Sequence, residues 1–61
     1  MTGLQFKLLR IRAGLHQHEL GARLGIASAR ISEMERGKRD VDPKLVKVLR
    51  DILRAKKEAT A

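Results

Sequence analysis

A single glycine, Gly25, interrupts an apolar helical pattern in the segment from Gln17 to Gly37. Large apolar residues recur on both sides of it at helical spacings, at Leu20, Leu24, Ile26, Ile31 and Met34. Because glycine adopts a positive φ at little cost, the chain can reverse its direction here. The pattern therefore predicts two short helices, over residues 17–24 and 28–36, joined by a tight turn as a helix-turn-helix.

A longer helix is predicted before this motif, over residues 2–13. Thr2 and Gln5 have the spacing of a capping box, which satisfies the first N–H groups of a helix. The apolar stripe of this helix is predicted from its i, i+4, i+7 spacing to contain Leu4, Leu8 and Ile11, with Phe6, Leu9 and Ala13 beside it.

The fourth helix is predicted from Pro43 to about Lys56, with Asp42 as its N-cap. Its core stripe is predicted to contain Leu45, Val48, Leu49 and Ile52. Val46 and Leu53 widen the apolar arc to roughly 160°, which is more than a small bundle needs from one helix. These two residues are candidates for contact with a second subunit, with ordinary core packing as the alternative.

These elements predict a compact all-α domain of four helices over residues 1–56, followed by a polar tail over residues 57–61. A chain of 61 residues buries only about 60% of its unfolded surface, so its stability is marginal. Its two short motif helices must pack closely, and the small residue Gly21 is predicted to permit that approach.

The net charge of +7, from 14 basic and 7 acidic residues, predicts a polyanionic partner. Nucleic acid is the first choice and an anionic membrane surface the second, with a basic protein of no such partner as the plain alternative. No apolar run approaches the ~20 residues of a membrane span. The absence of cysteine and of an N-terminal apolar leader indicates a reducing cytoplasm.

Enzyme classes are disfavoured by the inventory of side chains. The sequence has no nucleophile and base at a useful spacing and no glycine-rich phosphate loop, so no small-molecule substrate or cofactor is expected. His16 and His18 stand two residues apart near a helix start, without the further ligands that a metal site needs. They are instead candidates for phosphate contact or solvated surface residues.

The motif resembles the helix-turn-helix of the phage Cro/C1 repressor family, also called the XRE family. The resemblance is carried by Gln17, Leu20, small Gly21, "LGI" at 24–26, Ile31 and "MERGKR" at 34–39. The preceding "LLRIRAGLHQHEL" is similar to the entry of that family, and the resemblance covers residues 4 to about 53. It implies the lambda repressor-like fold without its usual fifth helix, and that helix carries dimer contacts in many relatives.

The resemblance also implies roles for individual residues. An ion pair between Arg10 and Glu35 would tie the first helix to the third. Base edges would be faced by Ala27, Ser28, Ala29, Ser32 and Glu33. Phosphates would be contacted by Gln17, Arg36, Lys38 and Arg39. From their own chemistry, Arg30 is expected to contact a phosphate, with a guanine as the alternative, and His16 and His18 are further candidates for phosphate contact. With few amide or arginine side chains among the base-facing residues, DNA shape is expected to carry part of the specificity.

The sequence thus predicts a double-stranded DNA-binding transcriptional regulator of Cro type. It is expected to be a repressor that binds a short palindromic operator as a homodimer, with helix 28–36 in the major groove, in the cytoplasm of a bacterial or phage-infected cell. One alternative is an antitoxin or other protein-interaction module that binds DNA secondarily. Another is a basic membrane or RNA binder that uses the fourth helix.

Overall fold

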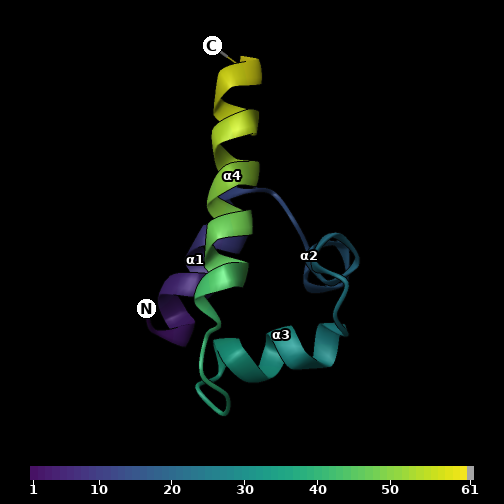
Figure 1. The fold of residues 1–61 in the computed structure, drawn as a ribbon, viewed down its shortest axis with the longest axis vertical. Coiled ribbons are helices and arrows are strands. Elements are labelled where there is room, and N and C mark those ends of the chain that lie inside the picture. Colours follow the sequence, from purple (N-terminus) through teal and green to yellow (C-terminus); the bar gives the residue numbers. More distant parts are fainter. Residues whose placement is uncertain (61) are drawn as a thin grey trace.

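The computed structural model describes residues 1–60, and the side chains of residues 1–58. It contains four helices, α1 (Gly3–Arg12), α2 (Gln17–Leu24), α3 (Ser28–Glu35) and α4 (Pro43–Thr60), and no strand in the described range. α3 packs on both α1 and α2, and α1 packs on α4. Figure 1 shows α3 lying across one end of the molecule, while the last turns of α4 project from the other end. The predicted all-α four-helix fold is confirmed.

The helix boundaries follow from local hydrogen bonds. The Thr2 hydroxyl accepts the Gln5 N–H at 3.1 Å and the Gln5 side chain accepts the Thr2 N–H at 2.9 Å, so the predicted capping box is present. The Asp42 carboxylate accepts the Lys44 N–H at 2.9 Å and begins α4 as predicted. Gly25 ends α2 with φ at 71°, in the left-handed region that glycine tolerates.

α4 continues past its predicted end near Lys56 to Thr60. The sequence "AKKEA" from 55 to 59 contains good helix formers and neither glycine nor proline, so nothing stops the helix there. Most of the predicted polar tail therefore carries helical backbone, while residue 61 lies outside the described residues.

The core is built where the four helices meet. Its fully buried side chains are Phe6, Leu20, Ile31, Met34 and Leu49, and Ala13 and Val46 complete it. Around it pack partly buried apolar residues, namely Leu9, Leu15, Leu24, Ile26, Val41, Leu45, Ile52 and Leu53. Val46 thus belongs to the core of a single chain, and Leu53 packs at the edge of that core.

The apolar stripe predicted for α1 does not face the core. Leu4, Leu8 and Ile11 are 63%, 48% and 53% exposed, whereas Phe6 is completely buried. At about 100° per residue, Leu4 and Leu8 lie roughly 160° around the helix from Phe6. Apolar residues occur on both faces of α1, so helical periodicity alone could not select the buried one.

One member of the predicted α4 stripe also lies largely outside the core. Val48 is 39% exposed, whereas Leu49 beside it is fully buried. The buried face of α4 is therefore centred on Val46 and Leu49, and Val48 lies at its margin.

Gly3 allows the start of α1 to lie directly against the end of α3. A Cβ atom at this position would collide with the backbone carbonyl oxygens of Met34 and Glu35. Because these are backbone atoms at the end of a packed helix, they cannot rotate away as a flexible side chain would. This contact could not be predicted from the sequence, in which Gly3 is simply the residue after the predicted cap Thr2.

We expect Gly3→Ala to destabilise the domain by about 1–3 kcal/mol, the usual cost of overpacking a close contact. Urea unfolding followed by circular dichroism measures this change. Lys7→Ala, at an exposed position of the same helix, is the control and should stay within about 0.5 kcal/mol of the parent. Equal stability of the two variants would contradict the proposed close packing of α1 on α3.

Candidate nucleic-acid interface

α2 and α3 form the predicted helix-turn-helix around a close backbone contact. A Cβ atom at Gly21 would lie 2.7 Å from the carbonyl oxygen of Ile26, so glycine fits the observed approach without displacement. The Ile26 N–H donates to the Gly21 carbonyl at 3.0 Å, which closes the turn after Gly25. Leu20 of α2 and Ile31 of α3 are completely buried and fix the two helices against each other.

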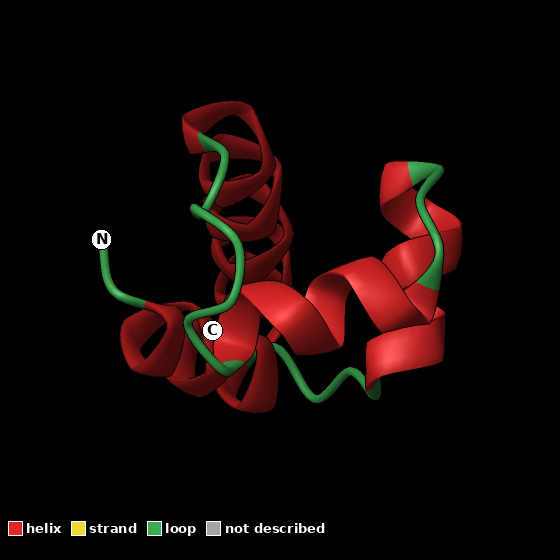
Figure 2. Ribbon diagram, turned by 90° about the horizontal axis from the view of Figure 1, so that it is seen from below, coloured by secondary structure: helices red, strands yellow, loops and turns green. Residues whose placement is uncertain are grey.

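The first turn of α3 is open to solvent. Ala27, Ser28, Ala29 and Arg30 are all exposed, while Ser32 and Glu33 are partly buried. Ala27 is the N-cap and has no side chain that could accept a hydrogen bond, so the first N–H groups of α3 have no cap. Figure 2 shows α3 in the foreground when the molecule is seen from below, with α2 beside it. The predicted base-facing residues thus lie together along one accessible helix.

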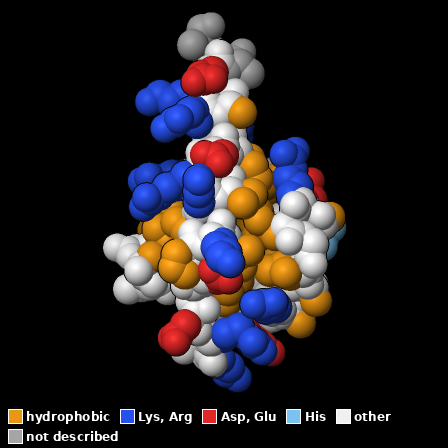
Figure 3. All heavy atoms as spheres, viewed as in Figure 1, with side chains coloured by type: hydrophobic (Ala, Val, Ile, Leu, Met, Phe, Trp, Pro, Cys, Tyr) orange, Lys and Arg blue, Asp and Glu red, His pale blue; other side chains and the backbone are white. Residues whose placement is uncertain are grey.

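Basic side chains lie on this helix and in the loop after it. Arg30, Arg36, Lys38 and Arg39 are exposed and follow one another along α3 and the loop after it. Figure 3 shows Lys and Arg side chains gathered at this end of the molecule and along one side of α4. Such a distribution favours a polyanion near the exposed face of α3.

Glu33, which was predicted to face a base edge, forms an ion pair with Arg39, which was predicted to contact a phosphate. The Arg39 Nε donates to the Glu33 carboxylate at 3.1 Å, and both side chains are partly exposed. This pair places a counter-charge beside the carboxylate of Glu33 on α3. A phosphate could attract Arg39 away at little cost, because exposed ion pairs are worth only about 0–1 kcal/mol.

A buried polar network ties this motif to the rest of the fold. The Arg10 Nε donates to Glu35 Oε2 at 2.7 Å, and Arg10 Nη2 donates to Glu35 Oε1 at 3.1 Å. Arg10 Nη1 donates to the Leu15 carbonyl at 2.9 Å, and the Gln17 amide donates to Glu35 Oε1 at 3.2 Å. The ion pair implied by the resemblance is therefore present. The links to Leu15 and Gln17 were not foreseen, and they fix the start of α2 against the end of α3.

Comparison with known protein families agrees with this geometry. A family model described as a helix-turn-helix domain matches residues 3–61, almost the whole chain. The chain belongs to the helix-turn-helix domain family. Membership supports DNA as the partner and a regulatory role, and it does not distinguish the Cro/C1 type from other types. Neither curated proteins nor solved structures gave a match.

The start of α2 in this helix-turn-helix protein borders a shallow hollow that is lined by basic and polar side chains. Arg10, His16, Gln17 and His18 line it, and the two imidazole rings stack with centroids 5.7 Å apart. The His16 backbone N–H donates to the Glu19 carboxylate at 2.9 Å, and this hydrogen bond lowers the pKa of Glu19. Gln17, which was predicted to bind phosphate, lies in the wall of this hollow although its amide is already bonded to Glu35.

Neither a metal centre nor a membrane span emerges from the described part of the chain. Its His, Asp and Glu side chains nowhere gather in a group of three or more that could hold a metal ion. None of its helices has the length and apolar character required to cross a bilayer.

We expect Glu35→Ala to destabilise the domain by about 3 kcal/mol or more, because it leaves the Arg10 guanidinium buried without its counter-charge. Thermal unfolding followed by circular dichroism measures the loss. Glu33→Ala is the matched control, since it breaks the exposed pair with Arg39 and should cost no more than about 1 kcal/mol.

A second variant keeps this prediction testable if Glu35→Ala does not fold. Replacing both partners, in Arg10→Met/Glu35→Met, removes both buried charges and should recover most of the lost stability. Similar melting temperatures for the Glu33 and Glu35 variants would show that the buried pair does not hold the fold together.

Proposed function

We propose that this helix-turn-helix protein is a transcriptional regulator, a repressor of the Cro type, which binds a short operator in double-stranded DNA. The observation that carries the proposal is the accessible first turn of α3, which lacks a side-chain cap and carries the exposed Arg30, with Arg36, Lys38 and Arg39 exposed at and beyond the other end of the helix. A helix of this kind can enter the major groove with its N-terminal residues at the base edges. Repression would follow from occlusion of the polymerase on DNA in the cytoplasm.

Ala27, Ser28, Ala29, Ser32 and Glu33 are the proposed base-facing residues. Ser28 donates or accepts with little discrimination, and the alanines can pack on a thymine methyl group. Ser32 and Glu33 are partly buried, so the exposed first turn approaches the bases most easily. Because these contacts discriminate weakly, the sequence dependence of DNA shape supplies the remaining specificity.

The proposed phosphate contacts lie on both sides of α3. His16, Gln17 and His18 bring the N-terminus of α2 to one strand, where helix N–H groups favour an anion. Arg30, Arg36, Lys38 and Arg39 contact the backbone along α3 and after it. The bond from Gln17 to Glu35 supports this docking, because it orients the start of α2 before DNA arrives.

We further propose that the protein binds a palindromic operator as a homodimer. Two recognition helices about 34 Å apart would then enter successive major grooves on one side of the duplex. Val46 is buried within the single chain, so it is not accessible for the predicted contact with a second subunit. Leu53, which is partly buried at the edge of the core, remains the proposed contact.

In-vitro selection from random DNA duplexes at about 150 mM salt tests this function, because the nonspecific electrostatic contribution is reduced under that condition. We expect a two-fold symmetric site with one fixed spacing between its halves. Enrichment of a single half-site would contradict the homodimer and leave the DNA-binding role intact. No enrichment, with binding that vanishes as salt rises, would contradict the sequence-specific regulator.

A charge-matched pair of variants then tests the docking of α3. We expect Arg36→Gln to weaken binding to the selected duplex about tenfold and to reduce the salt dependence by about one phosphate contact. Lys57→Gln removes the same charge from the projecting end of α4 and should change affinity less than about twofold. Fluorescence anisotropy titrations at several salt concentrations measure both quantities. Equal effects of the two variants would mean that only the overall charge matters.

A further inference from the structure

α1 has an apolar surface that the fold does not cover. Leu4, Leu8 and Ile11 are each about half exposed or more, and Met1 before the helix is 50% exposed. At about 100° per residue the three helical residues lie within one arc of roughly 60°. A contiguous apolar surface on so small a domain is typical of a protein-interaction site.

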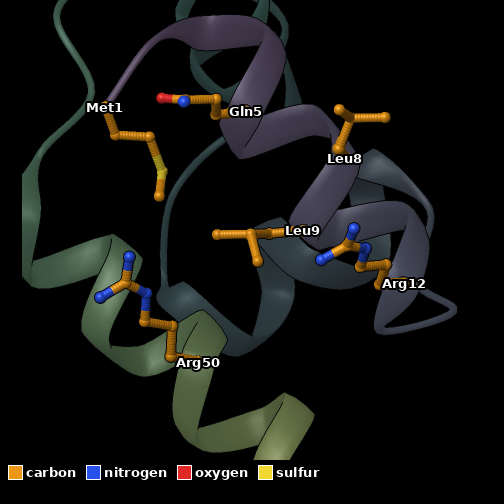
Figure 4. Close-up of a pocket in the computed structure, with 6 residues that line it drawn as sticks. All are labelled: Met1, Gln5, Leu8, Leu9, Arg12 and Arg50. Atoms are coloured by element: carbon orange, nitrogen blue, oxygen red, sulfur yellow. The ribbon is translucent and has the colours of Figure 1, made fainter.

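This stripe adjoins a hollow between α1 and α4. The hollow has a volume of about 400 Å³ and is lined by Met1, Gln5, Leu8, Leu9, Arg12 and Arg50. In the view of Figure 4, Leu9 lies between the two guanidinium groups, and Arg50 points from α4 toward Met1. Leu8 lines the hollow and also belongs to the exposed stripe. The stripe and the hollow therefore form one surface, which we call the α1 face.

The α1 face carries cations without counter-charges. α1 contains Lys7, Arg10 and Arg12 and no acidic residue. Of these, Arg10 is occupied by Glu35, whereas neither Arg12 nor Arg50 has an ion pair or side-chain hydrogen bond among the described residues. An apolar surface flanked by unpaired guanidinium groups is complementary to a segment that is both apolar and acidic.

The charge and shape of the α1 face also indicate which kind of ligand it can bind. A second copy would place Lys7, Arg12 and Arg50 against the same cations, so self-association through this surface is disfavoured. DNA would satisfy the arginines but would leave Leu4, Leu8 and Ile11 exposed. A flat anionic bilayer surface does not fill a recess, whereas a side chain of a helical segment can.

We propose that the α1 face binds an acidic, apolar helical segment of another protein. Its apolar side chains would cover Leu8 and its neighbours in the stripe, and its carboxylates would pair with Arg12 and Arg50. This surface is formed by α1 and α4, whereas the proposed DNA contacts belong to α2, α3 and the loop after it. The proposal does not depend on the identity of the operator.

Selection from a displayed library of random peptides tests the proposal. Peptides of about 16 residues are long enough for four helical turns. The full chain serves as bait, and we expect enrichment of peptides that combine Asp or Glu with Leu, Ile or Phe at i, i+3 or i+4 spacing. The absence of such a pattern would overturn the proposal.

Variants then locate the binding of the best enriched peptide. We expect Leu8→Gln, and separately Arg12→Gln/Arg50→Gln, to weaken the peptide about tenfold, as loss of central interface contacts does. Leu8→Met should preserve binding, and Arg23→Gln, at an exposed site on α2, should change it less than about twofold. Because the altered side chains are accessible, unchanged circular dichroism spectra serve as the control for folding. Peptide binding that ignores these substitutions would overturn the assignment to the α1 face.

Two further probes test whether the α1 face binds a membrane or DNA instead of an acidic peptide. Vesicles of phosphatidylcholine and phosphatidylglycerol test the membrane, and a random-sequence duplex tests DNA. If either binds through Leu8, Arg12 and Arg50 while no acidic peptide is enriched, the proposal is overturned in favour of that ligand. We expect instead that Leu8→Gln leaves binding of both probes within about twofold, since it changes no charge.

Discussion

The ion pair between Arg10 and Glu35 is the interaction on which the arrangement of the helices depends. Its two hydrogen bonds join α1 to α3, and the further bonds to Leu15 and Gln17 bring in the start of α2. The Glu35 side chain is only 3% exposed, and Arg10 supplies the opposite charge and the hydrogen bonds that a buried carboxylate requires. In a chain with one small core, this directional contact specifies the helix positions that nonspecific apolar burial would leave undetermined.

The parts of the fold that local chemistry determines were predictable from the sequence. Gly25 and the capping residues act within a few positions of themselves, and the structure has them where the pattern places them. The Arg10–Glu35 pair came from the family resemblance, since no local rule joins residues 25 positions apart. Of the site, the sequence identified the accessible helix, while its hydrogen bonds depend on side-chain geometry that a spacing pattern does not contain.

The errors have one common physical origin. α1 carries apolar residues on opposite faces, and the choice between them is made by what packs against the helix. Phe6 fills the core, and Arg10 reaches Glu35 from the same side of α1. Gly3 allows α3 to pack closely against the start of this helix. The opposite side, which carries Leu4, Leu8 and Ile11, is therefore left exposed to solvent. For the same reason the pairing of Glu33 with Arg39 was not foreseen, because the two residues meet only when the loop after α3 folds back.

The projecting end of α4 is expected to be less stable against local unfolding than the rest of the domain. The side chains of residues 55–58 are all exposed, so the backbone hydrogen bonds around them are supported by little burial. Amide protons in these turns can exchange with solvent through local fraying, while those beside Leu20 and Ile31 must wait for the whole domain to open. We therefore expect the end of α4 to open by local fraying while the domain around the helix-turn-helix stays folded.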